Sequence, residues 1–347
     1  MTPTDGHGHA SRAIIISDRE HGLPYSKGLM AGAIMTAGLS PARAYHVAQT
    51  IEDRLLETGR DAVSTGELRR LATDVLRDEA GERYAEAYMK WQAVADLDRP
   101  LIILIGGGTG VGKSTIATQL GARLGIVRII STDAIREVMK GVVSRRFMPA
   151  LYTSSFNADE MVRAKIPAGE DPVLAGFREQ AAAVAVGVRA LVERALTEGT
   201  DVIIEGAHIV PGFVTTDDLR SRAVVVQLAV TVDDEDLHRS HFSVRSHQAR
   251  SRPQHRYLDH FDSIRRIQKF IRSQALAHSV PIVSNYNLDA TIASVIELVT
   301  TTATKAASAG RRPSGRKPVD PAVAPRHVPD ATERLRAVAR SSEEDAS

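Results

Sequence analysis

The sequence feature that most constrains the fold is a continuous stretch from residue 101 to residue 124. Residues 101–105 are consecutive leucines and isoleucines, which predicts a strand buried on both faces of a parallel sheet. Residues 107–114 fit Gly-x-x-x-x-Gly-Lys-[Ser/Thr], the pattern of a phosphate-binding loop, or P-loop. Residues 115–124 then carry apolar side chains at helical spacing. Strand, loop and helix stand in the order that the motif requires, so we expect an α/β fold.

The residue types in this loop suit the binding of a nucleotide triphosphate. Glycines let backbone N–H groups approach phosphate oxygens, and the helix that follows adds the positive end of its dipole. We expect Lys113 to reach the β- and γ-phosphates of ATP, and the Ser114 hydroxyl to bind Mg²⁺. The alternative is a glycine-rich turn that matches the pattern by accident, and the flanking strand and helix argue against it. The residues expected to bind the nucleotide are Gly107, Gly108, Thr109, Gly110, Val111, Gly112, Lys113, Ser114 and Thr115.

Composition sets wider limits. The chain has 347 residues, which favours two domains, and its 43% hydrophobic content can form a sizeable core. It has no cysteine, which excludes disulfides and thiol catalysis. No apolar run approaches the length of a membrane span and the first ten residues lack a signal-peptide core, so we expect a cytoplasmic protein. Residues 305–347 carry nine Lys/Arg and six Asp/Glu, whereas the whole chain is only +2, so we expect no folded basic face for nucleic acid.

The first block of the chain, residues 13–96, predicts a small and mostly helical domain. A β-branched run at 14–16 and a turn at 18–25 precede helices at 27–36, 41–58, 64–80 and 82–94. Ser64 and Glu67 have the spacing of a capping box at the start of the third helix. Residues 1–12 are expected to be disordered, and the polar linker at 96–100 marks the domain boundary.

This block resembles an ATP-cone, a small nucleotide-sensing domain. The matching stretches are residues 14–16, 24–28, 44–56 and 84–88. The basic Lys-Arg pair that usually follows the first strand of this family is absent, and residues 17–20 read Ser-Asp-Arg-Glu instead. Arg19 and Lys27 are then the candidates for nucleotide binding. The alternative is a helical domain that only packs against the P-loop domain or dimerises.

Two acidic residues follow predicted strands of the P-loop domain. Asp133 comes after a strand at 127–130, and Glu205 directly follows a strand at 202–204. Open α/β sheets bind ligands at the carboxyl ends of their strands, so Asp133 is placed to accept a proton from an acceptor hydroxyl, or to hold Mg²⁺ through water. Glu205 is the candidate for ordering the Mg²⁺ shell or the attacking group. The alternative reading of the first site is a helix cap, with Ser131 or Asp133 starting a helix at 135–139.

Cations and hydroxyl groups after Asp133 predict a pocket for an anionic acceptor. The candidate ligands are Lys140, Arg145, Arg146 and Tyr152, the last at the start of a hydroxyl-rich run. A solvated helix face is the alternative for each of these cations. His208, close to Glu205, is a further candidate for hydrogen bonding to the acceptor, although a lone histidine near a turn is more often structural.

Residues 238–256 are dense in arginine and histidine, which predicts a mobile lid over the reacting groups. Arg245 and Arg250 are the candidates for contact with the transferring phosphoryl group. Four histidines in this segment raise the alternative of a metal site, but no acid or cysteine accompanies them at a zinc spacing. A nucleic-acid surface is the other alternative, and the segment has too few aromatic residues for a stacking platform.

The remaining pattern completes an α/β domain over residues 100–304. Further strands are expected at 223–232 and 280–283, and helices at 172–196, 262–278 and 291–301. The prediction is a five-stranded parallel sheet with helices on both faces, as in P-loop nucleotide kinases. The tail at 305–347 is rich in Ala, Ser, Pro and Arg and is expected to be disordered.

From residue 14 to residue 298 the chain is similar to 2-phosphoglycerate kinases that carry an amino-terminal ATP-cone. The most specific stretches are residues 24–28, 106–115, 131–139, 151–155 and 204–212. The resemblance implies transfer of the ATP γ-phosphoryl group to the hydroxyl of 2-phosphoglycerate, giving 2,3-diphosphoglycerate and ADP. It also implies that Asp133 deprotonates the acceptor, and that Arg136 joins the three cations named above in binding the acceptor's phosphate and carboxylate.

Two alternatives stay open. One is a P-loop kinase of another small anionic hydroxy acid or of a polynucleotide end, because related kinases change acceptors through a few pocket residues. The other is a binding protein that senses ATP without turning it over. We expect ATP, Mg²⁺ and a small phosphorylated acid as ligands, and neither nucleic acid nor a membrane as partner; whether the chain forms a homo-oligomer is left open.

Overall fold

The computed structural model describes residues 14–17, 22–95, 99–162, 166–248 and 254–310. Its strands form two separate sheets, one in each half of the chain. The amino-terminal sheet has the order β2-β1-β3, with β1 (Ile15–Ile16) antiparallel to β2 (Leu23–Pro24) and parallel to β3 (Ala62–Val63). The segments expected to be disordered, residues 1–12 and most of 305–347, lie outside the described residues.

Four helices complete the amino-terminal block: α1 (Lys27–Met35), α2 (Pro41–Glu57), α3 (Thr65–Ala80) and α4 (Glu82–Ala95). Their apolar faces bury Ile34, Ile51 and Leu76 without solvent exposure. The predicted capping box is confirmed, since Ser64 and Glu67 exchange side-chain and backbone hydrogen bonds at the start of α3. Strand β3 was not predicted, because two residues are too few to show a strand period.

The second sheet has five parallel strands in the order β5-β6-β4-β7-β8, which confirms the predicted fold class. The central strand β4 (Leu101–Gly107) is buried along its whole length. On one side lie β6 (Val202–Glu205) and β5 (Ile129–Ser131), and on the other β7 (Val224–Thr231) and β8 (Ile282–Ser284). The chain leaves β4 for β5 and returns through β6, so the carboxyl end of β4 lies at a switch in strand order, where open α/β sheets bind ligands.

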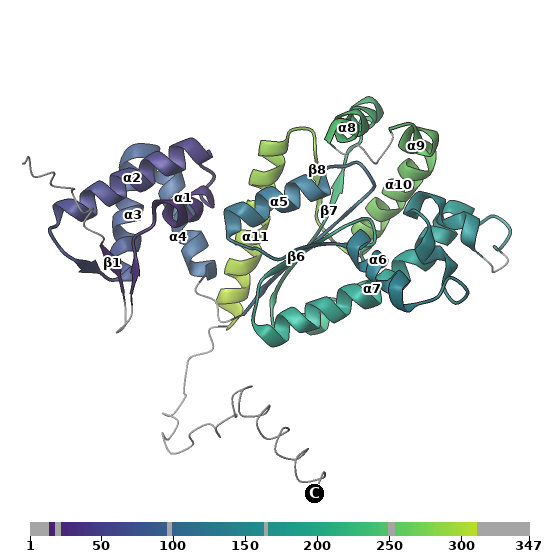
Figure 1. Cartoon of the computed structure of the whole chain (residues 1–347), viewed down its shortest axis with the longest axis horizontal. Coiled ribbons are helices and arrows are strands. Elements are labelled where there is room, and N and C mark those ends of the chain that lie inside the picture. The colour runs from purple at the N-terminus through teal and green to yellow at the C-terminus, as the bar shows by residue number, and fades with distance from the viewer. Residues whose placement is uncertain (1–13, 18–21, 96–98, 163–165, 249–253, 311–347) are drawn as a thin grey trace, which may run out of the picture. The chain divides into compact units, whose positions relative to one another are not determined.

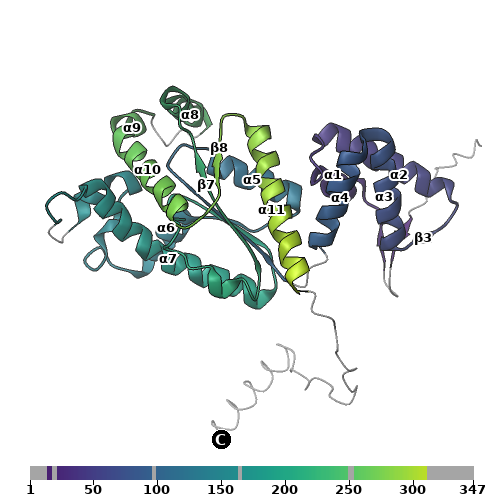
Figure 2. The same cartoon turned by 180° about the vertical axis from the view of Figure 1, so that it is seen from behind.

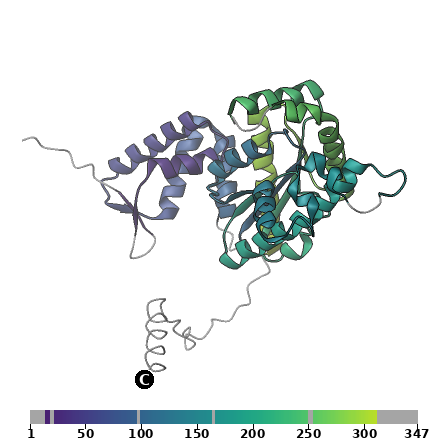
Figure 3. The same ribbon diagram turned by 45° about the vertical axis from the view of Figure 1, so that its right-hand side comes forward.

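Helices cover both faces of this sheet, as Figures 1 and 2 show from opposite sides and Figure 3 from an intermediate view. They are α5 (Lys113–Leu124), α6 (Thr132–Val142), α7 (Pro172–Glu198), α8 (Glu235–Gln248), α9 (Gln254–Asp259), α10 (Phe261–Ala277) and α11 (Leu288–Gly310), with short 3₁₀ turns η1 (Pro149–Tyr152), η2 (Ser155–Met161) and η3 (Asp217–Leu219).

The two faces of β4 divide these helices between them. Ile103 and Ile105 pack in one core cluster with side chains of α5 and α11, whereas Ile102 and Leu104 pack in another with α6 and α7. This alternation follows from the two-residue period of a strand. A third cluster joins α7 to α10 through Phe177, Ile264 and Ile267. The uninterrupted apolar run at 101–105 therefore reflects burial on both faces.

The boundaries of β5, α6 and α11 differ most from the sequence expectation. Strand β5 covers 129–131 rather than 127–130, and α6 begins at Thr132 rather than at residue 135, because Ser131 supplies the cap. The last helix, α11, runs to Gly310, past the predicted start of the disordered tail at residue 305. In the described part of the chain, no helix combines the length and apolar character needed to cross a bilayer.

Candidate active site

The P-loop connects the buried end of β4 to the first turn of α5. Gly107 closes the strand, the next five residues form the loop, and Lys113, Ser114 and Thr115 begin the helix. Gly112 has a φ of +92°, and a Cβ there would lie 2.5 Å from Asn285 Nδ2. Only glycine combines this backbone conformation with such close contact. The segment expected to bind nucleotide therefore has the strand–loop–helix geometry that presents backbone N–H groups to phosphate.

Lys113 and Ser114 lie at the amino end of α5, each with a fixed partner. The Lys113 side chain is 8% exposed, and its Nζ donates to the Gly108 carbonyl at 2.8 Å across the loop. Ser114 Oγ donates to Glu205 Oε1 at 2.9 Å. Strand register explains this second contact, because Ile105 at the end of β4 pairs with Glu205 at the end of β6.

The donor set at this point fits Mg²⁺. A hydroxyl and a carboxylate oxygen are hard ligands, and Mg²⁺ in nucleotide sites takes few protein ligands because phosphates and water supply the rest. Glu205 is only 6% exposed and touches the P-loop hydroxyl directly. Among the described residues no group of three or more His, Cys, Asp or Glu side chains forms a cluster that could hold a metal by itself.

Asp133 lies in the first turn of α6, next to the strand end that carries Glu205. The register pairs Ser131 with Glu205, which places the start of α6 beside β6. Ser131 is the residue that caps the helix, since its Oγ accepts from the Ala134 N–H at 3.1 Å. The Asp133 carboxylate is two-thirds exposed and lies 3.6 Å from Arg136 Nε. Its role is therefore not that of the cap.

A buried chain of hydrogen bonds runs beneath Asp133, through Thr132, His208 and Gln180. The Gln180 amide nitrogen donates to the Thr153 carbonyl at 3.1 Å, so its oxygen, 2.9 Å from His208 Nε2, must accept. His208 therefore carries its proton on Nε2, and its Nδ1 accepts from Thr132 Oγ at 2.8 Å. Burial lowers the pKa of His208 to about 4. The negative charge of Asp133 raises this pKa, and the positive charges of Arg136 and Lys113 lower it further.

This chain corrects the expectation that His208 contacts the acceptor. The ring is 1% exposed and both nitrogens are used within the protein. Its effect on the site is to hold Thr132, the neighbour of Asp133. Gly206 permits that approach, because a Cβ at this position would overlap the Thr132 hydroxyl.

Two other expected acceptor ligands have structural partners. The Tyr152 hydroxyl lies 2.9 Å from the carbonyl of Lys140 and 2.8 Å from that of Val143, so it ties η1 to the last turn of α6 rather than facing a ligand. Arg136 is 12% exposed, and its Nη1 donates to the carbonyls of Leu151 and Thr153 at 2.8 and 3.1 Å. Arg136 thus holds η1 as well as lying beside Asp133.

Three of the remaining expected cations, Lys140, Arg145 and Arg146, lie in α6 or just after its end. Lys140 pairs with Glu137 at 2.7 Å, and its ammonium lies 5.5 Å from the centre of the Tyr152 ring. Arg145 and Arg146 are exposed after the end of α6, and Arg145 Nη2 lies 3.8 Å from Met161 Sδ. Arg245 lies in α8, but its side chain is outside the described residues, as is the whole of Arg250. Their predicted contact with the phosphoryl group stays a prediction.

Sequence reasoning missed the side chains that hold the P-loop from outside. His238, His241 and Asn285 each donate to a P-loop carbonyl at 2.8–2.9 Å. Two of them stood out in the sequence only as possible metal ligands. No local pattern could have found these contacts, because each joins residues more than 120 positions apart.

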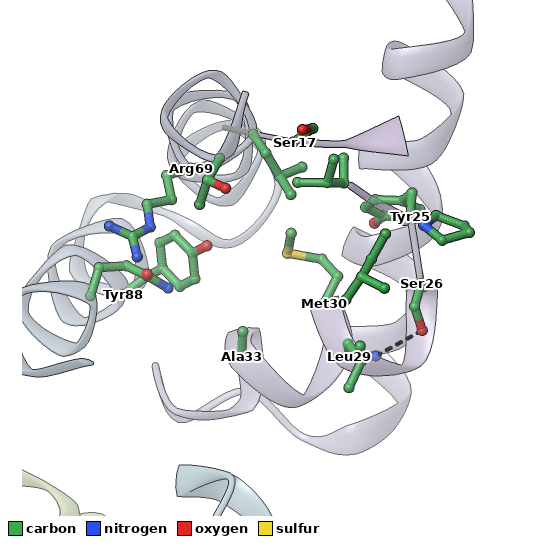
Figure 4. A pocket seen from close by; sticks show the side chains of 14 residues that line it. Ser17, Tyr25, Ser26, Leu29, Met30, Ala33, Arg69 and Tyr88 are labelled. Atoms are coloured by element: carbon green, nitrogen blue, oxygen red, sulfur yellow. Dashed lines mark hydrogen bonds between the residues drawn. The ribbon is translucent and has the colours of Figure 1, made fainter. Parts of the chain in front are cut away.

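The amino-terminal block contains a separate cavity of about 550 Å³ (Figure 4). Its lining is mostly apolar, and Arg69 is the charged side chain among the described residues that line it. Arg69 lies beside the ring of Tyr88, whose pKa burial raises to about 12. Lys27, a candidate for nucleotide binding, is not among the residues that line this cavity, and Gln49 and Glu52 each lie 3.0 Å from its amine. Arg19 lies outside the described residues.

Comparison with known proteins identifies both halves of the chain. Residues 15–96 match the ATP cone domain family, and residues 101–281 match an AAA domain family. The 2-phosphoglycerate kinase of Methanothermobacter thermautotrophicus is 42% identical, over 85% of this chain and 96% of that protein. The chain belongs to the 2-phosphoglycerate kinase family.

Other members support the assignment. The 2-phosphoglycerate kinases of Methanopyrus kandleri and Pyrococcus furiosus are 39% and 37% identical, over 87% and 92% of their lengths. Among solved structures, shikimate kinase from Acinetobacter baumannii with shikimate matches at 16% identity and a TM-score of 0.35, over 61% of this chain and 97% of that one. Family membership makes the chain an ATP-dependent phosphotransferase that acts on a hydroxyl group of a small molecule.

Proposed function

We propose that this chain transfers the γ-phosphoryl group of ATP to the hydroxyl of 2-phosphoglycerate, forming 2,3-diphosphoglycerate and ADP. The observation that carries the proposal is its identity of 42% to a 2-phosphoglycerate kinase over nearly the whole of that protein. The arrangement of Lys113, Ser114 and Glu205 at the P-loop is consistent with phosphoryl transfer.

In the proposed reaction, the P-loop and Lys113 hold the phosphates of ATP. Asp133 accepts the proton of the acceptor hydroxyl as its oxygen attacks the γ-phosphorus, and the bond to the β–γ bridging oxygen breaks to leave ADP. Bound Mg²⁺ supplies neutralisation of charge on the β- and γ-phosphates. Ser114 and Glu205 would hold it, with Asp133 as a ligand through water.

The acceptor's two anionic groups need cations near Asp133. Arg136 and Lys140 lie on the same helix as Asp133, and Arg145 and Arg146 are exposed after the end of that helix. We assign the phosphate and carboxylate of the acceptor to these four side chains. Arg245 and Arg250 would neutralise the charge that develops on the transferring group.

The test is release of ADP from MgATP by the full chain, with 2-phosphoglycerate, with 3-phosphoglycerate, or with no acceptor. These two acids carry the same charged groups but exchange the positions of phosphate and hydroxyl. A difference in rate between them therefore shows that the enzyme recognises the positions of these groups and not only their charge. We expect stimulation by 2-phosphoglycerate and loss of that stimulation in Lys113→Ala. ³¹P NMR of the product should show two phosphoester resonances.

Each other outcome has a distinct meaning. Greater stimulation by another phosphorylated hydroxy acid would overturn the acceptor assignment and leave the kinase assignment unchanged. ATP binding without turnover on any acceptor would favour an ATP sensor.

A further inference from the structure

Three consecutive carbonyl groups of the P-loop are held by side chains from distant parts of the chain. The Thr109 carbonyl lies 2.8 Å from His238 Nε2, the Gly110 carbonyl 2.9 Å from His241 Nδ1, and the Val111 carbonyl accepts from Asn285 Nδ2 at 2.9 Å. In a trans peptide the carbonyl and the next N–H point in opposite directions. Anchoring these carbonyls outward therefore directs the following N–H groups to the inside of the loop, where phosphate binds.

The tautomer of His238 follows from its second partner. Arg265 Nη1 lies 3.4 Å from His238 Nδ1, and because a guanidinium only donates, Nδ1 must accept. The proton is then on Nε2 and is donated to Thr109. Arg265 is itself fixed, since it donates to the carbonyls of Val232 and Asp233 at 2.6 and 2.8 Å.

The His238 ring has no freedom to leave this position. It is fully buried, and its centre lies 5.4 Å from the rings of both Phe242 and Phe261. Burial lowers its pKa to about 4, so the ring is neutral at physiological pH. It therefore contributes no charge to phosphate binding, which separates its role from that of Lys113.

The loop also packs directly on the helix that carries His238. Gly110 has a φ of +86°, and a Cβ there would overlap Phe242 and lie 3.2 Å from His238 Nε2. The backbone of the loop is thus in contact with α8, with no side chain between them. Any displacement of His238 would therefore displace the backbone of the loop as well.

We propose that His238 is a positioning residue for the nucleotide: through the Thr109 carbonyl it fixes the P-loop backbone in the conformation that binds the phosphates of MgATP. His241 has the same function at Gly110 and contributes less, because its side chain is only partly buried. The proposal depends on ATP binding at the P-loop and not on the identity of the acceptor, so it can fail or hold independently of the proposed reaction.

The first test is His238→Phe, which keeps the aromatic packing and removes the donor. We expect the Kd and KM for MgATP to rise about tenfold, the size of effect produced by leaving one buried carbonyl unpaired. His238→Gln, whose amide nitrogen occupies a position similar to Nε2, should restore most of the affinity. Calorimetric Kd values are corrected for the binding that remains in Lys113→Ala, which reports nucleotide bound elsewhere in the chain.

His208→Phe is the matched control on the other side of the site. His208 is equally buried and neutral but hydrogen-bonds Thr132 rather than the P-loop. This variant should lower kcat more than it weakens the binding of MgATP, because it acts on the turn that carries Asp133. The proposal predicts the opposite split for His238→Phe.

Two outcomes would overturn the proposal. One is a folded His238→Phe protein with the Kd for MgATP of the parent chain. The other is a His238→Gln protein that is folded but no better than His238→Phe. If His238→Phe does not fold, His241→Ala decides, since a parent-like Kd there would also contradict the anchoring of the loop.

Discussion

Glu205 is a carboxylate with little access to solvent, and its partner explains why it is tolerated. A buried charge is costly unless it is paired or hydrogen-bonded. The Ser114 hydroxyl donates to it at 2.9 Å, and the carboxylate ends the strand next to the P-loop strand. Its charge is thus held at the place where a divalent cation on the phosphates would sit.

We predict that Glu205→Gln lowers kcat by at least about 100-fold and raises the Mg²⁺ concentration needed for half-maximal rate. The amide keeps the shape and can still accept from Ser114, so the fold should be retained. The measurement is acceptor-dependent ADP release against Mg²⁺ concentration.

Glu198→Gln is the control, because Glu198 lies at the end of α7 and pairs with Arg194 at 2.8 Å. It should show the same rate and Mg²⁺ dependence as the parent chain. A parent-like Mg²⁺ dependence of Glu205→Gln would contradict the assignment.

The start of α6 connects a local capping interaction to the chemistry of the site. Ser131 ends β5 and caps α6, and the next two residues are Thr132, bound to His208, and Asp133. The position of the Asp133 carboxylate therefore depends on how the first turn of this helix is held.

Ser131→Ala should lower the unfolding free energy by about 1 kcal/mol, the usual cost of a lost cap. We also expect it to lower kcat, because the turn that carries Asp133 is less firmly positioned. Ser64→Ala makes the same chemical change at the capping box of α3, in the amino-terminal block. Thermal unfolding should show similar losses for the two variants, while only Ser131→Ala loses activity. Equal activity in both would show that the cap does not position Asp133.

The elements that the sequence predicted are those with strong local signals. Each of these signals is contained in a short stretch of sequence. They are the strand–loop–helix at the P-loop, the acids that follow β5 and end β6, and the capping box of α3. Strand β3 and the turns η1 and η2 were missed because they are too short or too irregular to have a period. His208 and Tyr152 were expected to bind the acceptor, and both instead hold backbone or side chains of α6 and η1.

What the sequence could not give is the set of contacts that depends on strand order. The order β5-β6-β4-β7-β8 brings Thr132 to His208 across 76 residues and Val111 to Asn285 across 174. A single sequence shows residue types along the chain, and these pairs become neighbours only when the sheet is assembled. The sequence therefore did not predict the side chains that hold the P-loop and the start of α6 in place.

Two buried neutral histidines make the stability of the folded chain depend on pH. His208 and His238 each have a pKa lowered to about 4 by burial, against about 6.5 in an unfolded chain. Between these values the unfolded chain binds protons that the folded chain does not. Stability is thus fully present above about pH 6.5 and is lost as the pH falls toward 4.

From pH 7 to pH 5 we predict a loss of roughly 2 kcal/mol for each of these rings. Ion pairs lower the pKa of carboxylates such as Glu193 and Glu198, and these groups reduce the stability only below the ordinary pKa of Glu. The loss of stability between pH 7 and pH 5 is therefore assigned to the two histidines.

Native-state hydrogen exchange of amides in β4 and β6 measures the unfolding free energy of the sheet directly. His238→Phe and His208→Phe should each reduce the difference between pH 7 and pH 5 by about half, whatever their effect at pH 7. His46→Phe, at an exposed site in α2, should retain the full difference. An unchanged difference in both core variants would mean that neither ring resists protonation in the folded chain, which would contradict the lowered pKa of both histidines.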